Sequence, residues 1–252
     1  MKPIRRIRAQ WSIMPVAIFL ALWEIAGRYL IQNPALLPPF SAVIRVFAEL
    51  AGNGVLLENF LRSLTRVVLG FLLGSTAGLA MGVILGWREM LHKALHPLIS
   101  LLYPIPALGW LPIFMLWFGI GELLPIAVIF VCSFFPVLYN TVTGIRGVDR
   151  DFIRAARTLG ASDRKILTTV LLPLALPSIF TGLRLESGMA WRTIIAAEMV
   201  AIPTGIGALL MRAESLIRMD IVIVCLMVLS VMCFSFERFF LFLERETSGR
   251  WR

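Results

Sequence analysis

The chain has 252 residues, of which 59% are hydrophobic and 15% charged, and its mean hydropathy is +0.86. This composition excludes an ordinary soluble domain. The formal net charge of +9 is compatible with nucleic-acid binding, with anionic lipid or with a membrane-orientation signal, so the positions of the charges must decide. Three cysteines in apolar runs without a CxxC spacing, and only two histidines, predict neither a disulfide nor a metal site.

Six apolar runs are long enough to cross a bilayer core of about 30 Å, which needs roughly 20 residues per helix. They predict spans at about 11–31, 64–86, 97–118, 123–143, 166–200 and 221–241, within a single membrane domain over residues 1–252. A signal peptide is the alternative for the first run, but the run is longer than a typical signal core and no A-x-A-like cleavage site follows it. We therefore expect an all-α membrane protein with six transmembrane helices.

The orientation of these spans follows from the lysines and arginines, which cytoplasmic loops retain. The N-terminal tail, the loop near residue 90, the loop 146–165 and the C-terminal tail carry sixteen of them, from Lys2, Arg5, Arg6 and Arg8 to Arg250 and Arg252, whereas the opposite loops carry four. Both termini are therefore expected in the cytoplasm. The positive charge is explained by orientation, with some attraction to membrane lipid, and requires no nucleic acid.

Five glycines spaced by four residues lie along the second span: Gly70, Gly74, Gly78, Gly82 and Gly86. Small residues at this spacing let membrane helices approach closely, so we interpret them as packing residues. A four-residue spacing drifts by about 40° per step on an α-helix, which predicts that the ridge winds round to several neighbours.

The third span is interrupted by Pro104 and Pro106. Proline removes an amide donor, and broken backbone at membrane depth is tolerated only where protein or a water-filled cavity surrounds it. The span is expected to face the protein interior or a translocation path, although a kink used only for packing fits equally well.

The fifth span carries charges that cannot pair along their own helix. Arg184, Glu186, Arg192 and Glu198 are never three or four residues from an opposite charge. The nearest polar candidates for partners are Glu24 in the first span and Asn140 in the fourth. Because Arg184, Trp191 and Glu198 recur every seven residues on one face, these three and Arg192 are candidates for a path lining or gate; ordinary buried or snorkelling charges are the alternative.

The loop 146–165 contains a pattern typical of a short amphipathic helix. Asp151 is a possible N-cap, and Phe152, Ala155, Ala156 and Leu159 fall at positions i, i+3, i+4 and i+7. Gly160 suits the end of that helix, and Ser162 suits the start of the next. Such a helix fits the groove of a partner protein or, alternatively, the surface of lipid head groups.

This loop resembles the EAA loop of bacterial ABC-importer permeases, whose pattern is E-A-A-x3-G-x9-I-x-L-P. The matching residues are Arg154-Ala155-Ala156, Gly160 and Val170-Leu171-Leu172-Pro173. Arg154 stands where the family usually has Glu, which reverses a charge, and Val170 stands where it usually has Ile.

Further segments resemble the nitrate/sulfonate/taurine permeases of that family. They are 37–43, Arg62-Ser63-Leu64-Thr65-Arg66, 104–121, 176–184 and Ala197-Glu198-Met199. The resemblance implies a MetI-like permease in the bacterial inner membrane. It also implies a homodimer that works with two ATP-binding cassette subunits and an extracytoplasmic substrate-binding protein.

The resemblance assigns expected roles to two groups of residues. The ATPase-coupling residues are expected to be Phe152, Arg154, Ala155, Ala156, Leu159, Gly160 and Pro173, and the residues that dock the binding protein are expected to be Gly205 and Gly207. The chain contains no G-x-x-x-x-G-K-[ST] loop, so it should bind no ATP; ATP and Mg are expected on the partner, and the chain itself should not be an enzyme.

The sequence leaves the solute open. An anion such as nitrate, a sulfonate, taurine or bicarbonate is expected. The competing functions are an ion-coupled secondary transporter, suggested by Glu24, Glu186 and Glu198 inside spans, and a channel or assembly factor without a pump.

Overall fold

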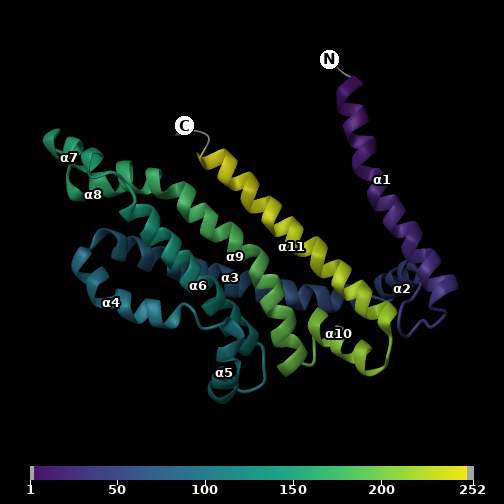
Figure 1. The fold of residues 1–252 in the computed structure, drawn as a ribbon. Coiled ribbons are helices and arrows are strands. Elements are labelled where there is room, and N and C mark those ends of the chain that lie inside the picture. The colour runs from purple at the N-terminus through teal and green to yellow at the C-terminus, as the bar shows by residue number, and fades with distance from the viewer. Residues whose placement is uncertain (1–2, 249–252) are drawn as a thin grey trace.

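The computed structural model describes residues 3–248, with side chains for residues 14–246, and every regular element in that range is a helix (Figure 1). Lys2, Arg250 and Arg252, which the charge count includes, lie outside the described residues, as do the side chains of Arg5, Arg6 and Arg8. Apolar composition without alternating strand patterns explains the all-helical result.

The helices follow one another with short connections. In chain order they are α1 (Pro3–Ile25) with a π-helical turn (Ala26–Leu30), α2 (Phe40–Gly52), α3 (Val55–Trp87), α4 (Glu89–Leu102), a 3-10 turn (Ala107–Trp110), α5 (Leu111–Phe118), α6 (Leu123–Arg146), α7 (Arg150–Thr158), α8 (Asp163–Ile166), a π-helical turn (Leu167–Leu171), α9 (Leu172–Ala201), α10 (Ile206–Ser215) and α11 (Met219–Ser248).

Four stretches among the described residues are long and apolar enough to cross a membrane. They are α3, α6, the rod Asp163–Ala201 that joins α8 to α9, and Met219–Glu246 of α11. A fifth results if α4 and the pair Ala107–Phe118 form one span, and these two parts are bent by 88° at the prolines. The predicted span 11–31 is not among the five. Only 11% of the apolar window of α11 is buried within the chain, and several of its large apolar side chains, such as Val231, Phe234 and Phe239, are exposed, so one side of this helix is left for lipid or another subunit.

The glycine ridge of α3 packs against α6. A Cβ at Gly74 would contact the carbonyl oxygen of Phe130, and one at Gly82 would lie 2.6 Å from the Cβ of Thr141. All five glycines face α6, so the prediction that the ridge winds round to several helices is wrong for the glycines, although α3 contacts α9 with other residues. The contacts on α6 also advance by about four residues, and two helices that wrap around each other keep such ridges together.

The largest buried cluster joins α3, α9, α10 and α11 to α2. Trp191 of α9 is 1% exposed and stacks on Phe60 at 6.5 Å between ring centroids, while Phe236 of α11 meets it edge-on at 5.4 Å. These aromatic contacts fix α9 between α3 and α11.

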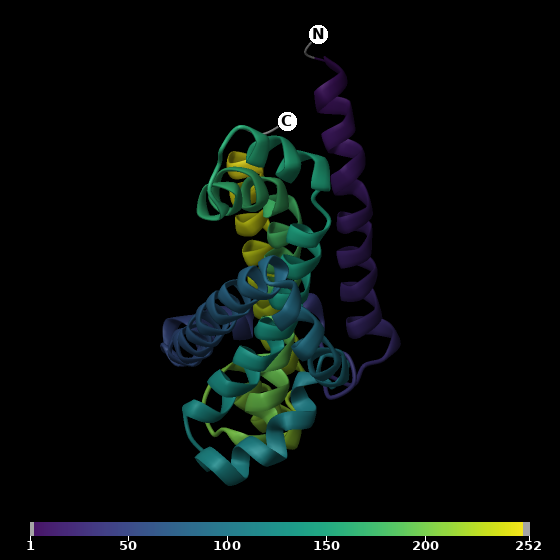
Figure 2. The same cartoon turned by 90° about the vertical axis from the view of Figure 1, so that its left-hand side faces the viewer.

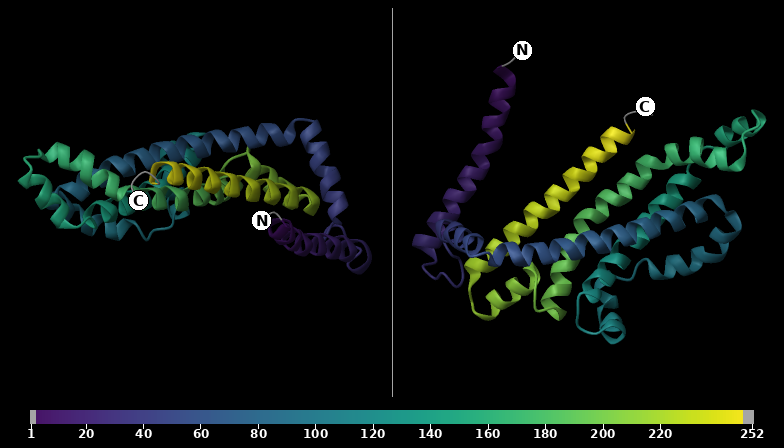
Figure 3. Two further views of the ribbon diagram at one scale, coloured as in Figure 1. Left: turned by 90° about the horizontal axis from the view of Figure 1, so that it is seen from above. Right: turned by 180° about the vertical axis from the view of Figure 1, so that it is seen from behind.

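The elements lie in a definite order along the molecule. α7 and α8 lie at the same end as the start of α1 and the end of α11, and α5 and α10 lie at the opposite end (Figures 1 and 2). α1 stands apart from the other long helices, and α2 connects it to them (Figure 3). Within the chain, α1 therefore lacks the packing partners that the other long helices have.

Candidate translocation path and docking surfaces

α7 is a short helix with defined ends. The Asp149 side chain accepts a hydrogen bond from the backbone N–H of Asp151 at 3.0 Å, so Asp149 is the N-cap and the prediction of Asp151 is wrong by two residues. Asp149 has the extended backbone that a cap needs, whereas Asp151 already lies in the first turn, where an acid is also favoured. Gly160 follows the helix with φ +77°, and the Ser162 hydroxyl caps α8, both as predicted.

The two faces of α7 have different surroundings. Ile153 and Ala156 pack on the apolar cluster formed by the ends of α6 and α9, which anchors the helix to the body. On the other side Phe152 is 57% exposed and Leu159 is 87% exposed, and Ala155 is exposed beside them. α7 thus presents an apolar surface, made by Phe152, Ala155 and Leu159, that the chain itself does not cover.

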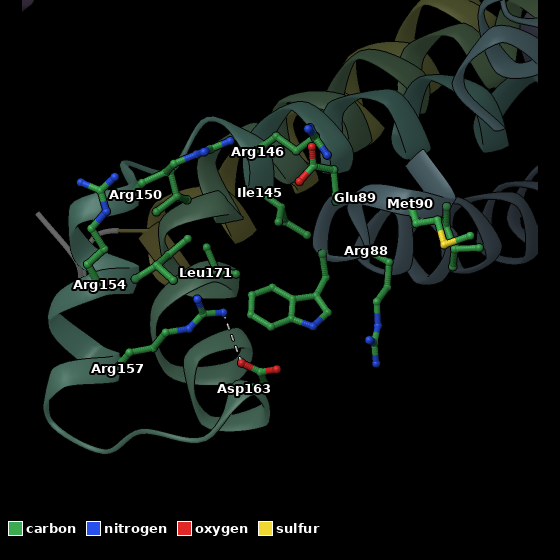
Figure 4. Close-up of a pocket in the computed structure, with 15 residues that line it drawn as sticks. Arg88, Glu89, Met90, Ile145, Arg146, Arg150, Arg154, Arg157, Asp163 and Leu171 are labelled. Atoms are coloured by element: carbon green, nitrogen blue, oxygen red, sulfur yellow. Dashed lines mark hydrogen bonds and ion pairs between the residues drawn. The ribbon is translucent and has the colours of Figure 1, made fainter. Parts of the chain in front are cut away.

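Arginines surround the inner side of α7. A cavity of about 840 Å³ lies between α7 and the start of α4. Its lining includes Arg88, Arg146, Arg150, Arg154 and Arg157 together with Glu89 and Asp163 (Figure 4). Arg157 is 3.5 Å from Asp163, and Arg154 is 3.0 Å from Asp151. Four of the basic residues predicted for this loop, Arg146, Arg150, Arg154 and Arg157, therefore line the same cavity.

Pro173 lies in the first turn of α9, directly after a π-helical turn over Leu167–Leu171. Proline inside a helix collides with the carbonyl four residues earlier, and the wider π turn moves that carbonyl aside. The segment from α8 to α9 therefore continues as one rod.

A buried ion cluster lies at the opposite end of the molecule. Arg66 of α3 is 1% exposed and uses all five of its N–H donors. Its nitrogens donate to the Glu198 carboxylate at 2.7 Å, to both Glu122 carboxylate oxygens at 2.6 and 2.7 Å, and to the carbonyl and hydroxyl of Thr204 at 2.7 and 2.8 Å. The cluster joins α3, α9, the loop before α6 and the loop before α10.

Side chains of α3 and α9 accept hydrogen bonds from the backbone of the loop before α10. The backbone N–H of Gly205 donates to Asn59, that of Ile206 to Ser63 and that of Gly207 to Glu198, each at 2.9 Å. Gly205 has φ +110°, and a Cβ there would contact the Glu198 carboxylate, so only glycine fits. Both glycines are buried, and Pro203 is the neighbouring residue that is exposed.

The intramembrane charges have partners other than those the sequence suggests. Glu198 pairs with Arg66, and Arg184 lies 3.4 Å from Glu244 of α11. Glu24 instead pairs with Arg28 on its own helix at 2.6 Å, and the Asn140 amide donates to the carbonyl of Pro136. The prediction of Glu24 and Asn140 as partners is therefore wrong, because sequence spacing does not reveal which helices become neighbours.

The other candidate path residues are separated by the fold. Trp191 lies in the core, and Arg192 is exposed with its guanidinium 3.8 Å from the sulfur of Met189. Pro104 and Pro106 lie in the exposed break between α4 and α5. Next to this break a cavity of about 140 Å³ is lined by Tyr103, Ile105, Cys132 and Glu186, among others.

Sequence reasoning missed several residues of the ion cluster. Glu122 is only the boundary of an apolar run in the sequence, and Asn59 has no expected role. Thr204 is expected only as part of segment 204–207, which resembles the loop that meets the binding protein, and not as a partner of Arg66. The signal that points to them is the segment Arg62–Arg66, which resembles the permease family and contains both Ser63 and Arg66. Only the fold shows that this segment meets Glu198.

Comparisons with known proteins agree with this architecture. A family model described as "Binding-protein-dependent transport system inner membrane component" matches residues 70–249. A putative ABC transporter permease protein of Methanocaldococcus jannaschii is 41% identical and covers 90% of this chain and 87% of its own length. The taurine transport system permease protein of Escherichia coli is 33% identical, and the match covers 92% of this chain and 90% of that protein. The nitrate import permease protein of Synechocystis is 32% identical, and the match covers 91% of this chain and 86% of that protein.

A solved structure of the MetNI methionine ABC transporter, in an inward-facing conformation, aligns with a TM-score of 0.58 at 17% identity, covering 71% of this chain and 91% of that chain. This likeness shows the fold alone, which is MetI-like as the sequence predicts. The family model covers well over half of the chain, and the relatives match along nearly all of it. The chain therefore belongs to the binding-protein-dependent transport system inner membrane component family, and it is the permease subunit of an ABC importer, a non-enzymatic membrane subunit whose ATPase is a separate partner.

Proposed function

We propose that two copies of this permease form the translocation path of an importer for a small solute, working with two ATP-binding cassette subunits and an extracytoplasmic binding protein. The solute belongs to the range that the relatives' names span, namely taurine, sulfonates and nitrate, with bicarbonate as a further candidate. ATP and Mg are bound by the partner ATPase, and this chain binds no cofactor. The importer lies in the cytoplasmic membrane, which in a bacterium is the inner membrane.

We further propose that the chain crosses the membrane six times with both termini in the cytoplasm. Residues 11–31 supply the remaining span. In the structure α7, the start of α1 and the end of α11 lie at the same end of the molecule (Figure 1). This arrangement supports the proposed orientation, because the arginine-rich loop and the two termini then lie together on the cytoplasmic side.

The observation that carries the proposed coupling is the geometry of α7. Ile153 and Ala156 hold it to the body, while Phe152 and Leu159 are exposed. A helix that enters a groove on a partner needs such an uncovered apolar face. Because the rod of α8 and α9 begins directly after α7, movement of a docked ATPase tilts α9 and alternates access to the path.

The test is the double variant Phe152→Asp/Leu159→Asp. Both side chains are exposed, so the melting temperature should stay the same while the ATPase no longer copurifies and ATP-dependent uptake into vesicles is lost. Gly160→Asp should also weaken ATPase copurification and uptake, here with a modest fall in melting temperature, because φ +77° is strained for a residue with a Cβ.

Leu216→Asp is the matched control, because this leucine is 73% exposed but follows α10 at the opposite end, and the ATPase should copurify normally. Undiminished ATPase binding in the α7 double variant would refute the coupling role. Uptake by the permease without any ATPase would refute the importer and favour an ion-coupled secondary transporter or a channel.

A further inference from the structure

Glu186 is a buried acid that no described cation neutralises. It lies midway along α9 and is 8% exposed. The ion pairs of residues 14–246 leave it out: Arg66 is saturated by Glu122, Glu198 and Thr204, and Arg184 binds Glu244. An acid inside a membrane span without a partner is costly, and such residues usually face a pathway.

The only side-chain hydrogen bond that reaches Glu186 within the described residues comes from a thiol. The Cys132 Sγ of α6 lies 3.5 Å from Glu186 Oε2 and 3.3 Å from the hydroxyl of Thr193. A thiol is a weak donor, so it leaves most of the acceptor capacity of the carboxylate unused. The carboxylate thus remains available to a stronger donor.

The cavity beside Glu186 is open to such a donor. It has a volume of about 140 Å³ and is bounded by the broken backbone at Tyr103 and Ile105, by Cys132 and Pro136 of α6, and by Met189 of α9. Its lining contains one acid and no base. Water occupies about 30 Å³ per molecule, so an aminoethyl group fits, whereas a bulky solute does not fit as a whole.

We propose that the cavity at Glu186 binds the ammonium group of the transported solute, so that this permease carries an amine-bearing solute such as an aminoalkyl sulfonate rather than a plain anion. The inference rests on the proposed function, because it assumes that the break between α4 and α5 borders the path. The carboxylate accepts hydrogen bonds from the ammonium group, which supplies the charge that the chain itself does not.

Cys132 provides a probe of this cavity that does not depend on transport. In a Cys225→Ala/Cys233→Ala background, the full-length permease in lipid nanodiscs is treated with 2-aminoethyl methanethiosulfonate and, separately, with the 2-sulfonatoethyl reagent. The Cys132 sulfur attacks the reagent's sulfenyl sulfur, methanesulfinate leaves, and a mixed disulfide forms. Mass spectrometry gives both rates, which are divided by those of a free thiol in solution.

The cationic reagent is expected to react with Cys132 roughly tenfold faster than the anionic one, since a nearby carboxylate attracts the first and repels the second. Glu186→Gln should bring the two rates close together. Glu58→Gln is the matched control, because Glu58 is an exposed acid paired with Arg62 on α3, and it should leave the ratio unchanged. Taurine should slow the labelling, whereas ethanesulfonate, which lacks the amine, should not.

Equal normalised rates for the two reagents in the protein that retains Glu186 would overturn the proposal, and so would a failure of the 2-aminoethyl reagent to label Cys132 at all. Both results come from the protein with its native acid, so they do not depend on how the Glu186→Gln variant folds. Loss of the ATPase requirement would instead overturn the proposed importer and leave the labelling ratio untouched.

Discussion

Arg66 shows how a charge at the end of a membrane helix is accommodated. Its guanidinium is buried, and every donor has an acceptor on another segment of the chain. Ser63 and the N–H of Gly207 complete the coordination of Glu198. A buried ion pair is tolerated only when its remaining hydrogen-bonding sites are filled, and this cluster meets that condition.

Removing one partner should therefore be costly. We expect Arg66→Met to destabilise the protein by roughly 3–5 kcal/mol, because Glu198 is left buried without its cation. Arg62→Met is the control: its pair with Glu58 is exposed, and such pairs contribute about 0–1 kcal/mol. The measurement is thermal unfolding in detergent. Adding Glu198→Gln to Arg66→Met should restore part of the loss, and an unchanged melting temperature in Arg66→Met would contradict the role of the cluster.

Glu122 makes part of this stability depend on pH. The hydrogen bonds from Arg66 hold the pKa of the Glu122 carboxyl below its usual value. A carboxyl whose pKa is lower in the folded than in the unfolded protein stabilises the fold at any pH above its unfolded-state pKa. This stabilisation is lost as the pH falls through the folded-state pKa. The melting-temperature difference between wild type and Glu122→Gln should thus be present at neutral pH and shrink below about pH 4.3. It should be small, because the carboxylate is 59% exposed.

At the scale of elements, the contact between α3 and α6 depends on glycines, which let the two helix backbones approach closely. A Cβ at Gly78 would contact the carbonyl oxygen of Phe134. Interiors are packed closely enough that one added methyl group forces helices apart.

We accordingly expect Gly78→Ala to lower the melting temperature, even though alanine favours a helix more than glycine by about 1 kcal/mol. Gly188→Ala on α9 is the matched control, since nothing lies within 4 Å of a Cβ there, and it should be neutral or stabilising. The comparison is made by thermal unfolding of both variants. Equal stability of the two would show that the ridge is not a close-contact surface.

At the scale of the whole molecule, the two ends differ in their residues. α7 lies at one end and α10 at the other (Figure 1). The arginine-lined cavity adjoins α7, and the ion cluster adjoins the loop before α10. The proposed topology, which rests on the distribution of lysine and arginine, places the first end in the cytoplasm.

Cysteines introduced at exposed leucines test this orientation. In intact cells, a membrane-impermeant maleimide should label Leu216→Cys, whereas Leu159→Cys should react only after permeabilisation. Leu159 and Leu216 are 87% and 73% exposed within the chain, and the cells used lack the ATPase subunit that is proposed to cover Leu159, so burial does not limit either reaction. The parent chain, in which Cys132, Cys225 and Cys233 are buried or half-buried, serves as the background. The reverse labelling pattern would invert the proposed topology.

Short sequence patterns correctly predicted those turns, caps and breaks that depend only on the backbone preferences of nearby residues. The turn at Gly160, the cap at Ser162 and the break at Pro104 and Pro106 all follow from backbone preferences of single residues. The N-cap of α7 was misplaced by two residues because Asp149 and Asp151 are equally good candidates until the backbone conformation is known.

By itself, the sequence determined that this protein is a helical membrane permease and where its amphipathic helix lies. Hydropathy, helical periodicity and the permease motif depend only on the order of residues along the chain. Only the tertiary structure decided which charges neutralise each other and which stay alone: Glu198 meets Arg66, and Glu186 meets no described cation. The reason is physical. Pairing depends on which helices become neighbours, and the packing of glycines and apolar side chains from distant segments determines that choice.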